Sequence, residues 1–417
     1  MQIEVIDTVE RLVQIELNWD ELYRRDPHAH FYLSSQFLIC VAMRAEGKFR
    51  ILAAWSDDGR CLGLLPMIVT IRWSKSNHCL YNVLDMLGHV FDADYTGILC
   101  DPSSEKEVCR AFAQEISGMP FGRIILNYVS GPADRLDAFI SAFDPAVFDT
   151  KHKEQFINDG QTNNLICPYI DLPDQFPRYL AALSSNMRQK LRRLLRQLES
   201  DPSLKVTRSR PETYTRDITI LADLWYRKHV DGKGQKRAAH LADLFKEAIM
   251  LGLASGNVYL AIIWRGDTPI AAQANYIDLV KRQALFHVGG RDESVRDFSA
   301  GLMLQAHCIR WSIANGLKRY DFTIGNEPYK HSLGGIDRHI ASAEVFTKAG
   351  GNVTQKLDEN ARDDVLKIIR AFVRKARSQD AVIAASQALA TWPDLESTGD
   401  VKALIANISS RPSQGTG

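Results

Sequence analysis

Strand-like and helix-like patterns alternate along residues 1–130. Short apolar runs predict strands over 2–6, 49–55, 60–71, 94–100 and 123–129. Apolar residues at helical spacing predict helices over 8–25, 35–45 and 104–117; the first of these carries Val9, Leu12, Val13, Leu17 and Leu22 on one face. Such alternation favours a layered α/β domain in which helices cover a sheet.

The second half of the chain repeats this alternation. Helical patterns cover 173–200, 212–228, 239–255 and 299–315, and strand patterns cover 257–264, 269–279, 282–290 and 318–324. Beyond residue 350 the chain is polar and helical, and it ends in a Ser/Gly/Pro-containing stretch that predicts a frayed, disordered terminus. We expect domains over 1–170 and 171–350 and a helical tail over 351–417, whose helix 356–377 could dock on a partner or on its own chain.

Two predicted hairpins resemble each other. LAAWSDDGRCLGLLPMI and AIIWRGDTPIAAQANYI align without gaps when Trp55 is placed on Trp264. This similarity indicates a duplicated domain. The alternative is that any two hairpins containing a tryptophan look alike.

Charge and cysteine content exclude several classes of protein. The 417 residues carry 51 Lys and Arg against 50 Asp and Glu, a balance that argues against a protein that coats nucleic acid. The seven scattered cysteines form no CxxC pair, so we expect a reducing compartment and no disulfide framework. The N-terminus lacks a signal-peptide pattern, and no apolar run is long enough for a membrane helix. These features predict a cytoplasmic protein.

Familiar cofactor and nucleophile motifs are absent from the sequence. The chain has no P-loop, no GxGxxG after a strand, no GxSxG and no HExxH. The histidines are dispersed, so we expect no metal site. We turn to three other segments.

The first segment, Arg296–Leu302, precedes a predicted helix. Ser299, Ala300 and Gly301 are small, so a ligand could approach the first-turn N–H groups of the helix, which have no intrahelical acceptor. The segment therefore suits a pyrophosphate, with Arg296 nearby. The alternative is that Ser299 simply caps the helix.

The second segment, DFTIGNEPYK, follows a strand and carries Asp321, Glu327, Tyr329 and Lys330. The C-terminal ends of strands are where α/β sheets place their sites. Pro328 suits a first helical position, which would make Glu327 the cap. The alternative is a capped helix with a solvated ion pair.

The third segment is a basic helix over 187–198. One face is apolar, and five cations occupy the rest: Arg188, Lys190, Arg192, Arg193 and Arg196. These cations repel one another unless an anion lies nearby. A phosphate or nucleic-acid contact and a solvated face both remain open.

The order of these segments resembles the GNAT acyltransferase superfamily. A basic helix, a Trp hairpin, a strand, an S-A-G helix start and D-F-x-x-G-x-E-x-Y-K follow one another as in its CelD/BcsL-like branch of tandem GNAT domains, a relative of the Fem-type peptidyltransferases. The resemblance is good over 170–350 and loose over 1–170. It implies two GNAT-like domains of the α+β kind, each a mixed, mostly antiparallel sheet flanked by helices. The first would be degenerate, since DPSSEKE (101–107) lacks the loop motif.

The resemblance also implies roles for residues. GNAT domains hold acyl-CoA pyrophosphate on a [QR]xxGx[GA] loop, which here is similar to 296–301, with Ser299 in place of the first glycine. It implies Tyr329 as the acid that protonates the thiolate and Asp321 or Glu327 as the base. The implied catalytic set is Tyr329, Glu327, Asp321 and Lys330, and the implied donor set is Arg296, Ser299, Ala300, Gly301, Leu302, Arg188 and Arg192.

Three functions follow as expectations. We favour an N-acyltransferase that uses acetyl-CoA or another acyl-CoA as co-substrate, with no tightly bound cofactor, metal or DNA, and an amine-bearing small molecule or sugar as acceptor. The resemblance points to polysaccharide (cellulose) or envelope biosynthesis. The second is a Fem-like aminoacyltransferase that uses aminoacyl-tRNA. The third is a non-catalytic accessory protein of exopolysaccharide synthesis.

Overall fold

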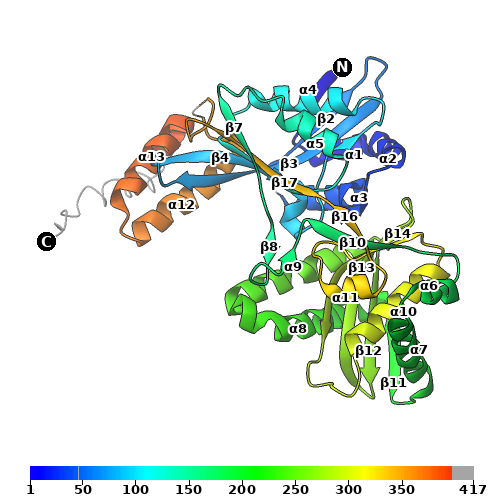
Figure 1. Cartoon of the computed structure of the whole chain (residues 1–417). Coiled ribbons are helices and arrows are strands. Elements are labelled where there is room, and N and C mark those ends of the chain that lie inside the picture. The colour runs from blue at the N-terminus through cyan, green and yellow to red at the C-terminus, as the bar shows by residue number, and fades with distance from the viewer. Residues whose placement is uncertain (46, 355, 397–417) are drawn as a thin grey trace.

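The chain folds into two lobes, each built on one sheet (Figure 1). The computed structural model describes residues 1–45, 47–354 and 356–396. The predicted frayed terminus, at 397–417, lies outside these ranges.

The first lobe contains an eight-stranded sheet. In spatial order its strands are β1 (Gln2–Ile6), β2 (Phe49–Trp55), β3 (Cys61–Ser74), β4 (Cys79–Met86), β6 (Arg123–Val129), β17 (Ala341–Thr347) and β7 (Phe148–His152), with β5 (Leu99–Cys100) paired to β3. Its helices are α1 (Val9–Gln14), α2 (Glu16–Arg25), α3 (Ser35–Arg44), α4 (Glu105–Ser117) and α5 (Ala133–Ile140), with short 3-10 turns η1 (Phe31–Leu33) and η2 (Leu87–Phe91).

The second lobe contains a seven-stranded sheet. In spatial order its strands are β11 (Leu204–Arg208), β12 (Val258–Arg265), β13 (Thr268–Asp278), β14 (Gln283–Arg291), β15 (Arg319–Asp321), β10 (Ile166–Asp171) and β16 (Ile336–His339). Its helices are α6 (Phe176–Ala182), α7 (Ser185–Ser200), α8 (Tyr214–Lys233), α9 (Gln235–Ala254), α10 (Ala300–Ala314) and α11 (Pro328–Ser332). A small hairpin, β8 (Phe156–Ile157) and β9 (Thr162–Asn163), lies where the chain passes between the lobes.

The two lobes share one topology. In each, an antiparallel meander (β2-β3-β4 or β12-β13-β14) is followed by a helix (α4 or α10) and a strand parallel to the last one (β6 or β15). The first hairpin of each meander even has a register shift at the aligned tryptophan, before Trp55 and before Trp264. The expected fold of two layered α/β lobes with mostly antiparallel sheets is confirmed.

The chain exchanges strands between the lobes. β17 lies in the first sheet, between β6 and β7, although its residues fall within 171–350. α12 (Arg362–Arg374) and α13 (Ser378–Thr391) pack on the first lobe, where Ile369 and Phe372 join Leu80 in one buried cluster. The tail therefore docks on its own chain. The division at residues 170 and 350 stays a prediction.

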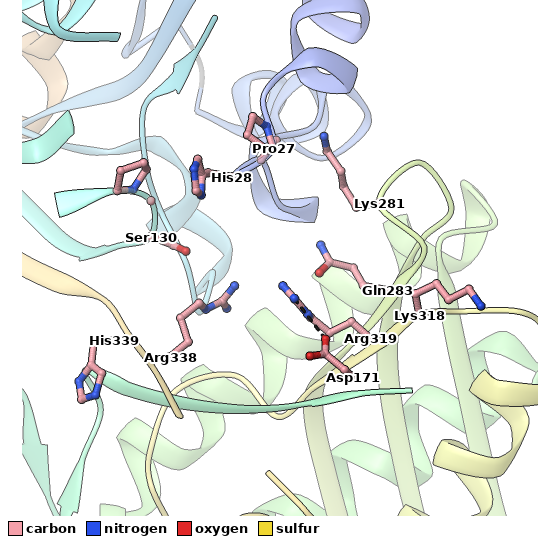
Figure 2. Close-up of a pocket in the computed structure, with 13 residues that line it drawn as sticks. Pro27, His28, Ser130, Asp171, Lys281, Gln283, Lys318, Arg319, Arg338 and His339 are labelled. Atoms are coloured by element: carbon pink, nitrogen blue, oxygen red, sulfur yellow. Dashed lines mark hydrogen bonds and ion pairs between the residues drawn. The ribbon is translucent and has the colours of Figure 1, made fainter. Parts of the chain in front are cut away.

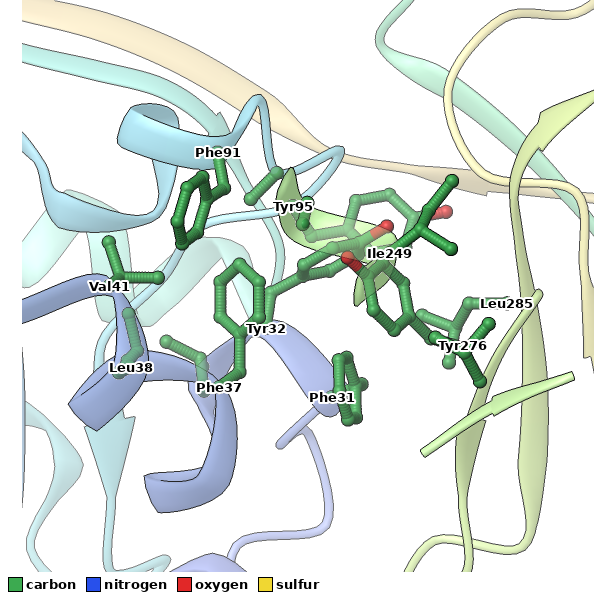
Figure 3. Close-up of a cluster of buried hydrophobic side chains, with 14 of the residues drawn as sticks. Phe31, Tyr32, Phe37, Leu38, Val41, Phe91, Tyr95, Ile249, Tyr276 and Leu285 are labelled. Carbon is green, nitrogen blue, oxygen red and sulfur yellow. The ribbon is translucent and has the colours of Figure 1, made fainter. Parts of the chain in front are cut away.

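A shared apolar core joins the lobes. Phe31 of the first lobe stacks on Tyr276 of the second with ring centroids 4.5 Å apart, and Tyr32 meets the same ring edge-on at 5.6 Å (Figure 3). Because aromatic side chains bury large apolar areas, this seam holds the lobes in one arrangement.

Several sequence-based bounds were wrong. The helix predicted over 8–25 breaks at Ile15 into α1 and α2, which leaves Val13 and Leu17 exposed. The helix predicted over 173–200 breaks before Ser184, whose side chain caps α7 by accepting from Met187 N–H.

Predicted strands were also too long. The strand predicted over 94–100 is reduced to β5, and that over 318–324 to β15. β15 ends early because Thr323 has φ +57° and its N–H bonds the Asp321 carboxylate at 2.8 Å.

Candidate active site

The site lies where the two parallel strands of the second sheet separate. β14 and β15 pair over three residues, Gln283–Leu285 with Arg319–Asp321, and β14 then continues to Arg291. Thr323 spans the start of the gap, since its hydroxyl donates to Phe286 O at 3.0 Å. The gap leaves a backbone edge of β14 to which an extended amide-bearing ligand could add.

The N-terminus of α10 opens beside the end of β14. Ser299 is the N-cap and makes no side-chain cap bond, so the first-turn N–H groups of Ala300, Gly301 and Leu302 have no cap from it. A Cβ on Gly301 would lie 3.3 Å from Arg291 Cδ, so Arg291 lies over this turn. Small residues and a guanidinium thus meet at one helix start, as an anion site needs.

Arg296, predicted to hold the same anion, is exposed. Arg291 was missed in the sequence, although it ends the strand before this loop. It forms an exposed ion pair with Glu293 at 3.0 Å, which a phosphate could replace.

The basic helix α7 lies against α10 but is not tied to this turn. Its leucines share a buried cluster with α10, and Arg310 of α10 bonds Glu199 at 2.5 Å. Arg188 donates toward Ala181 O at 3.5 Å, and Arg192 is exposed. Their place at the donor site stays a prediction.

Lys330 is a buried clamp. Its side chain is 3% exposed, and Nζ donates to Ile324 O at 2.5 Å and to Gly325 O at 2.8 Å. Nζ also lies 3.0 Å from Glu327 Oε2. Lys330 therefore fixes the loop after β15, with Glu327 at its solvent side.

Tyr329 is 41% exposed on the first turn of α11, and its ring meets Phe322 edge-on at 6.3 Å. Burial of the hydroxyl end, together with the Glu327 carboxylate, raises the pKa of Tyr329 above its ordinary value. The phenol is therefore protonated at neutral pH and can act as an acid.

Asp321 lies at the floor of the gap and is fully buried. Oδ1 accepts from Tyr95 at 2.7 Å and from Thr323 N–H, and Oδ2 accepts from Arg338 at 2.7 Å. With both oxygens engaged, this carboxylate is suited to holding Thr323 and Tyr95 in position.

A histidine that the sequence reading missed faces the other side of the gap. His287 is the extra residue of a bulge in β14, because Phe286 pairs with Asn275 and Val288 with Ala274. Its side chain is 2% exposed, and Nδ1 lies 3.6 Å from Asp94 Oδ2.

The surroundings of His287 contain other polar groups without partners. Within the described residues, neither ring nitrogen of His287 nor the Tyr276 hydroxyl has a hydrogen-bond partner. Burial and the neighbouring Asp94 raise the pKa of Asp92, which is on the same loop. Buried polar atoms without partners are rare, and a catalytic role is one of the reasons for which they occur. In the sequence, the one signal for His287 is its position within the apolar run 282–290, two residues before a pair of glycines.

Lys228 lies near the charged residues at the end of β14 and the start of α11. Burial lowers the pKa of Lys228, near the end of α8, and the charges that act on it are Arg291, Glu293 and Glu327. This lysine therefore lies between the end of β14 and α11.

The matching helix start in the first lobe is acidic. Ser104, the N-cap of α4, also makes no side-chain cap bond, but Asp101 and Glu105 lie at this start. Asp101 accepts from Ser103 N–H, and Glu105 bonds Arg135 at 2.5 Å. These carboxylates make the start of α4 less suited to an anion than that of α10.

Comparison with known families agrees with this asymmetry. Residues 185–331 match the model of the acetyltransferase (GNAT) domain family. The second lobe therefore carries a GNAT acetyltransferase domain, and the protein is a transferase. No curated protein sequence matches the chain.

Several solved structures are similar to this chain at low identity, and FemX shares its fold. FemX is similar over 84% of this chain and 98% of its own, at TM-score 0.54 and 13% identity. A conserved protein of unknown function from Bacteroides thetaiotaomicron VPI-5482 matches 83% of this chain and 100% of its own, at TM-score 0.49 and 13% identity. A tandem GNAT protein from the clavulanic acid biosynthesis pathway matches 83% of this chain and 98% of its own, at TM-score 0.44 and 10% identity.

None of the helices in 1–45, 47–354 and 356–396 combines the length and apolar character needed to cross a bilayer. No group of three His, Cys, Asp or Glu side chains in the same ranges is arranged to hold a metal ion.

Proposed function

We propose that the protein is an N-acyltransferase that moves an acyl group from acyl-CoA to an amine, at the gap between β14 and β15. The observation that carries the proposal is this gap together with the open first turn of α10. The pantetheine arm of CoA bears amides that can pair with the β14 edge, and its pyrophosphate suits a helix N-terminus. Of the predicted donor residues, Ser299, Ala300 and Gly301 would contact it through their backbone.

The two faces of the gap suit the two proton transfers. When the amine attacks the thioester carbonyl, a C–N bond forms, the C–S bond breaks and the amine loses a proton. His287 would take that proton at Nε2, with Nδ1–H directed at Asp94. Tyr329, on the α11 side, would give its proton to the departing thiolate.

This assignment changes the expected base. Asp321 is fully buried and already accepts hydrogen bonds on both oxygens, so it would position the loop instead. Glu327 is partly exposed and is the second candidate. A comparison of His287→Gln with Glu327→Gln separates the two, because loss of the base lowers kcat and removes the fall of kcat at low pH that protonation of the base causes.

Donor binding is the first test, on the full chain. Acetyl-CoA and longer acyl-CoAs should raise the melting temperature of the parent, because ligands that bind the native state stabilise it. Gly301→Glu places a carboxylate and bulk in the α10 turn and should abolish the shift. Ser104→Glu, at the matching N-cap of α4, is the control.

The alternatives give different results. A Fem-like aminoacyltransferase would be stabilised by aminoacyl-tRNA and not by acyl-CoA. An accessory protein would bind neither and would release no thiol from acyl-CoA with any amine. The CelD/BcsL-like branch and a role in cellulose or envelope polysaccharide synthesis stay part of this proposal, and an amino sugar is the first acceptor to try.

A further inference from the structure

A second cavity lies between the lobes, at the other end of the same strands. It encloses about 410 Å³ and opens at the starts of β14 and β15, whereas the gap lies at their ends (Figure 2). His28 and Ser130 come from the first lobe, and Lys281 and Arg319 from the second. The buried Tyr95–Asp321–Arg338 contacts separate it from the gap.

The lining is strongly cationic. Lys281, Lys318, Arg319 and Arg338 line it, and Asp171 is the one carboxylate among its described lining residues. Arg319 lies 3.3 Å from Asp171 and Arg338 lies 2.7 Å from the buried Asp321, so the two lysines make the cationic excess. Like charges held this close repel one another unless an anion neutralises them.

Aromatic rings orient two of these cations. The Arg319 guanidinium lies over the Tyr169 ring at 4.2 Å, and that of Arg338 lies over the Tyr95 ring at 4.6 Å. Planar, pre-oriented guanidinium groups match the oxygens of a phosphoryl group.

Lys281 adds a cation from the second lobe that already reaches the first. Its Nζ donates to Asp26 O at 2.7 Å, and burial lowers its pKa. A desolvated ammonium gains more from a neighbouring anion than an exposed one.

We propose that this cavity, the seam pocket, binds a phosphorylated small molecule, held by Lys281, Arg319 and Arg338. The volume suits a ligand of metabolite size rather than a free phosphate alone. All three side chains come from the second lobe, and His28 and Ser130 line the cavity from the first, so a ligand held there lies across the seam. Arg338 also donates to Asp321, which accepts from Thr323 N–H. A ligand held by Arg338 is therefore linked through Asp321 to the floor of the gap between β14 and β15.

Inorganic pyrophosphate is the probe, titrated into the full chain by calorimetry and followed by the melting temperature. The parent should bind it, and Lys281→Gln/Arg319→Gln should bind it at least about tenfold more weakly, since each charged hydrogen bond contributes on the order of 1.5–3 kcal/mol. Arg72→Gln/Lys75→Gln removes the same charge at exposed positions at the far end of β3 and should change nothing. Arg319→Lys keeps the charge without the fork and should give an intermediate affinity.

Further measurements distinguish the seam pocket from the donor site and from a site that binds any anion. Because the start of α10 is itself proposed to hold a pyrophosphate, the titration is repeated in Gly301→Glu, which should keep the binding that Lys281→Gln/Arg319→Gln weakens. Loss of all binding in Gly301→Glu, with full binding in Lys281→Gln/Arg319→Gln, would assign the ion to α10 and overturn the proposal. Absence of binding by the parent, or tighter binding of citrate than of pyrophosphate, would also overturn it. If the double variant melts far below the parent, the Arg319→Lys affinity decides: equality with the parent refutes the proposal.

Discussion

The buried side chain of His30 makes the free energy of unfolding depend on pH, and its burial sets the direction of that dependence. Its side chain lies in the seam, 2% exposed, with Nε2 3.3 Å from Thr96 O and its ring 5.5 Å from that of Tyr95. Burial, and then the positive charge of Arg338, lower the pKa of His30 to about 3. The folded protein thus holds this ring neutral at pH values where the unfolded chain protonates it.

The magnitude follows from linkage. A histidine whose pKa falls on folding contributes stability that is complete above about pH 6.5 and is lost as the pH falls toward the folded value. Each pH unit below 6.5 removes about 1.4 kcal/mol, so the loss is about 2 kcal/mol at pH 5. That is a large fraction of a typical free energy of unfolding.

His30→Phe isolates this contribution, because phenylalanine preserves the ring contacts and cannot take a proton. We expect the difference in free energy of unfolding between parent and variant to shift by about 2 kcal/mol in favour of the variant from pH 8 to pH 5. Urea unfolding at both pH values measures it. His240→Phe, on the exposed face of α9, is the matched control.

The reasoning would be refuted if the parent and His30→Phe lost stability equally between pH 8 and pH 5. The carboxylates common to both proteins cancel in this comparison. A constant difference between the two proteins would reflect only the lost Thr96 contact.

Three other substitutions test the site and its support. Tyr329→Phe should lower kcat for acyl transfer by about 100- to 10,000-fold with nearly unchanged acyl-CoA affinity, measured by thiol release and calorimetry; a full kcat would remove the phenol from the mechanism. Lys330→Met leaves buried carbonyls and Glu327 without their cation and should cost about 3–5 kcal/mol in urea unfolding, whereas stability equal to the parent would contradict the clamp. Gly290→Ala places a Cβ 2.5 Å from the Trp225 backbone nitrogen and should cost about 1–3 kcal/mol by forcing α8 away from β14; an unchanged melting temperature would argue against that close packing.

The seam illustrates what local pattern cannot supply. Phe31, Tyr32 and Tyr276 are ordinary apolar residues in the sequence, and their shared core depends on contacts more than 240 residues apart. The position of β17 likewise depends on distant contacts, because its apolar residues could pack in either sheet. Only the packing of the whole chain places it beside β6.

The sequence by itself determined most of the elements and is the basis of the proposed donor site, because both depend on neighbours along the chain. The spacing of hydrophobic residues distinguishes strands from helices. The helix start with Ser299, Ala300 and Gly301 can be recognised within the seven-residue segment Arg296–Leu302. Likewise Glu327 and Tyr329 follow a strand directly, so their place at its end could be predicted.

The tertiary structure decided which polar residues meet. Either Asp321 or Glu327 was expected to take a proton, and in the structure Tyr95 from the first lobe and Arg338 from β16 donate to the oxygens of Asp321. His287 was not singled out, because its bulge arises from the register of β13 and β14, and Asp94 reaches it from the other lobe. Proton-transfer partners and cation clusters form between segments distant in sequence, where burial and charge depend on the folded arrangement and not on spacing along the chain.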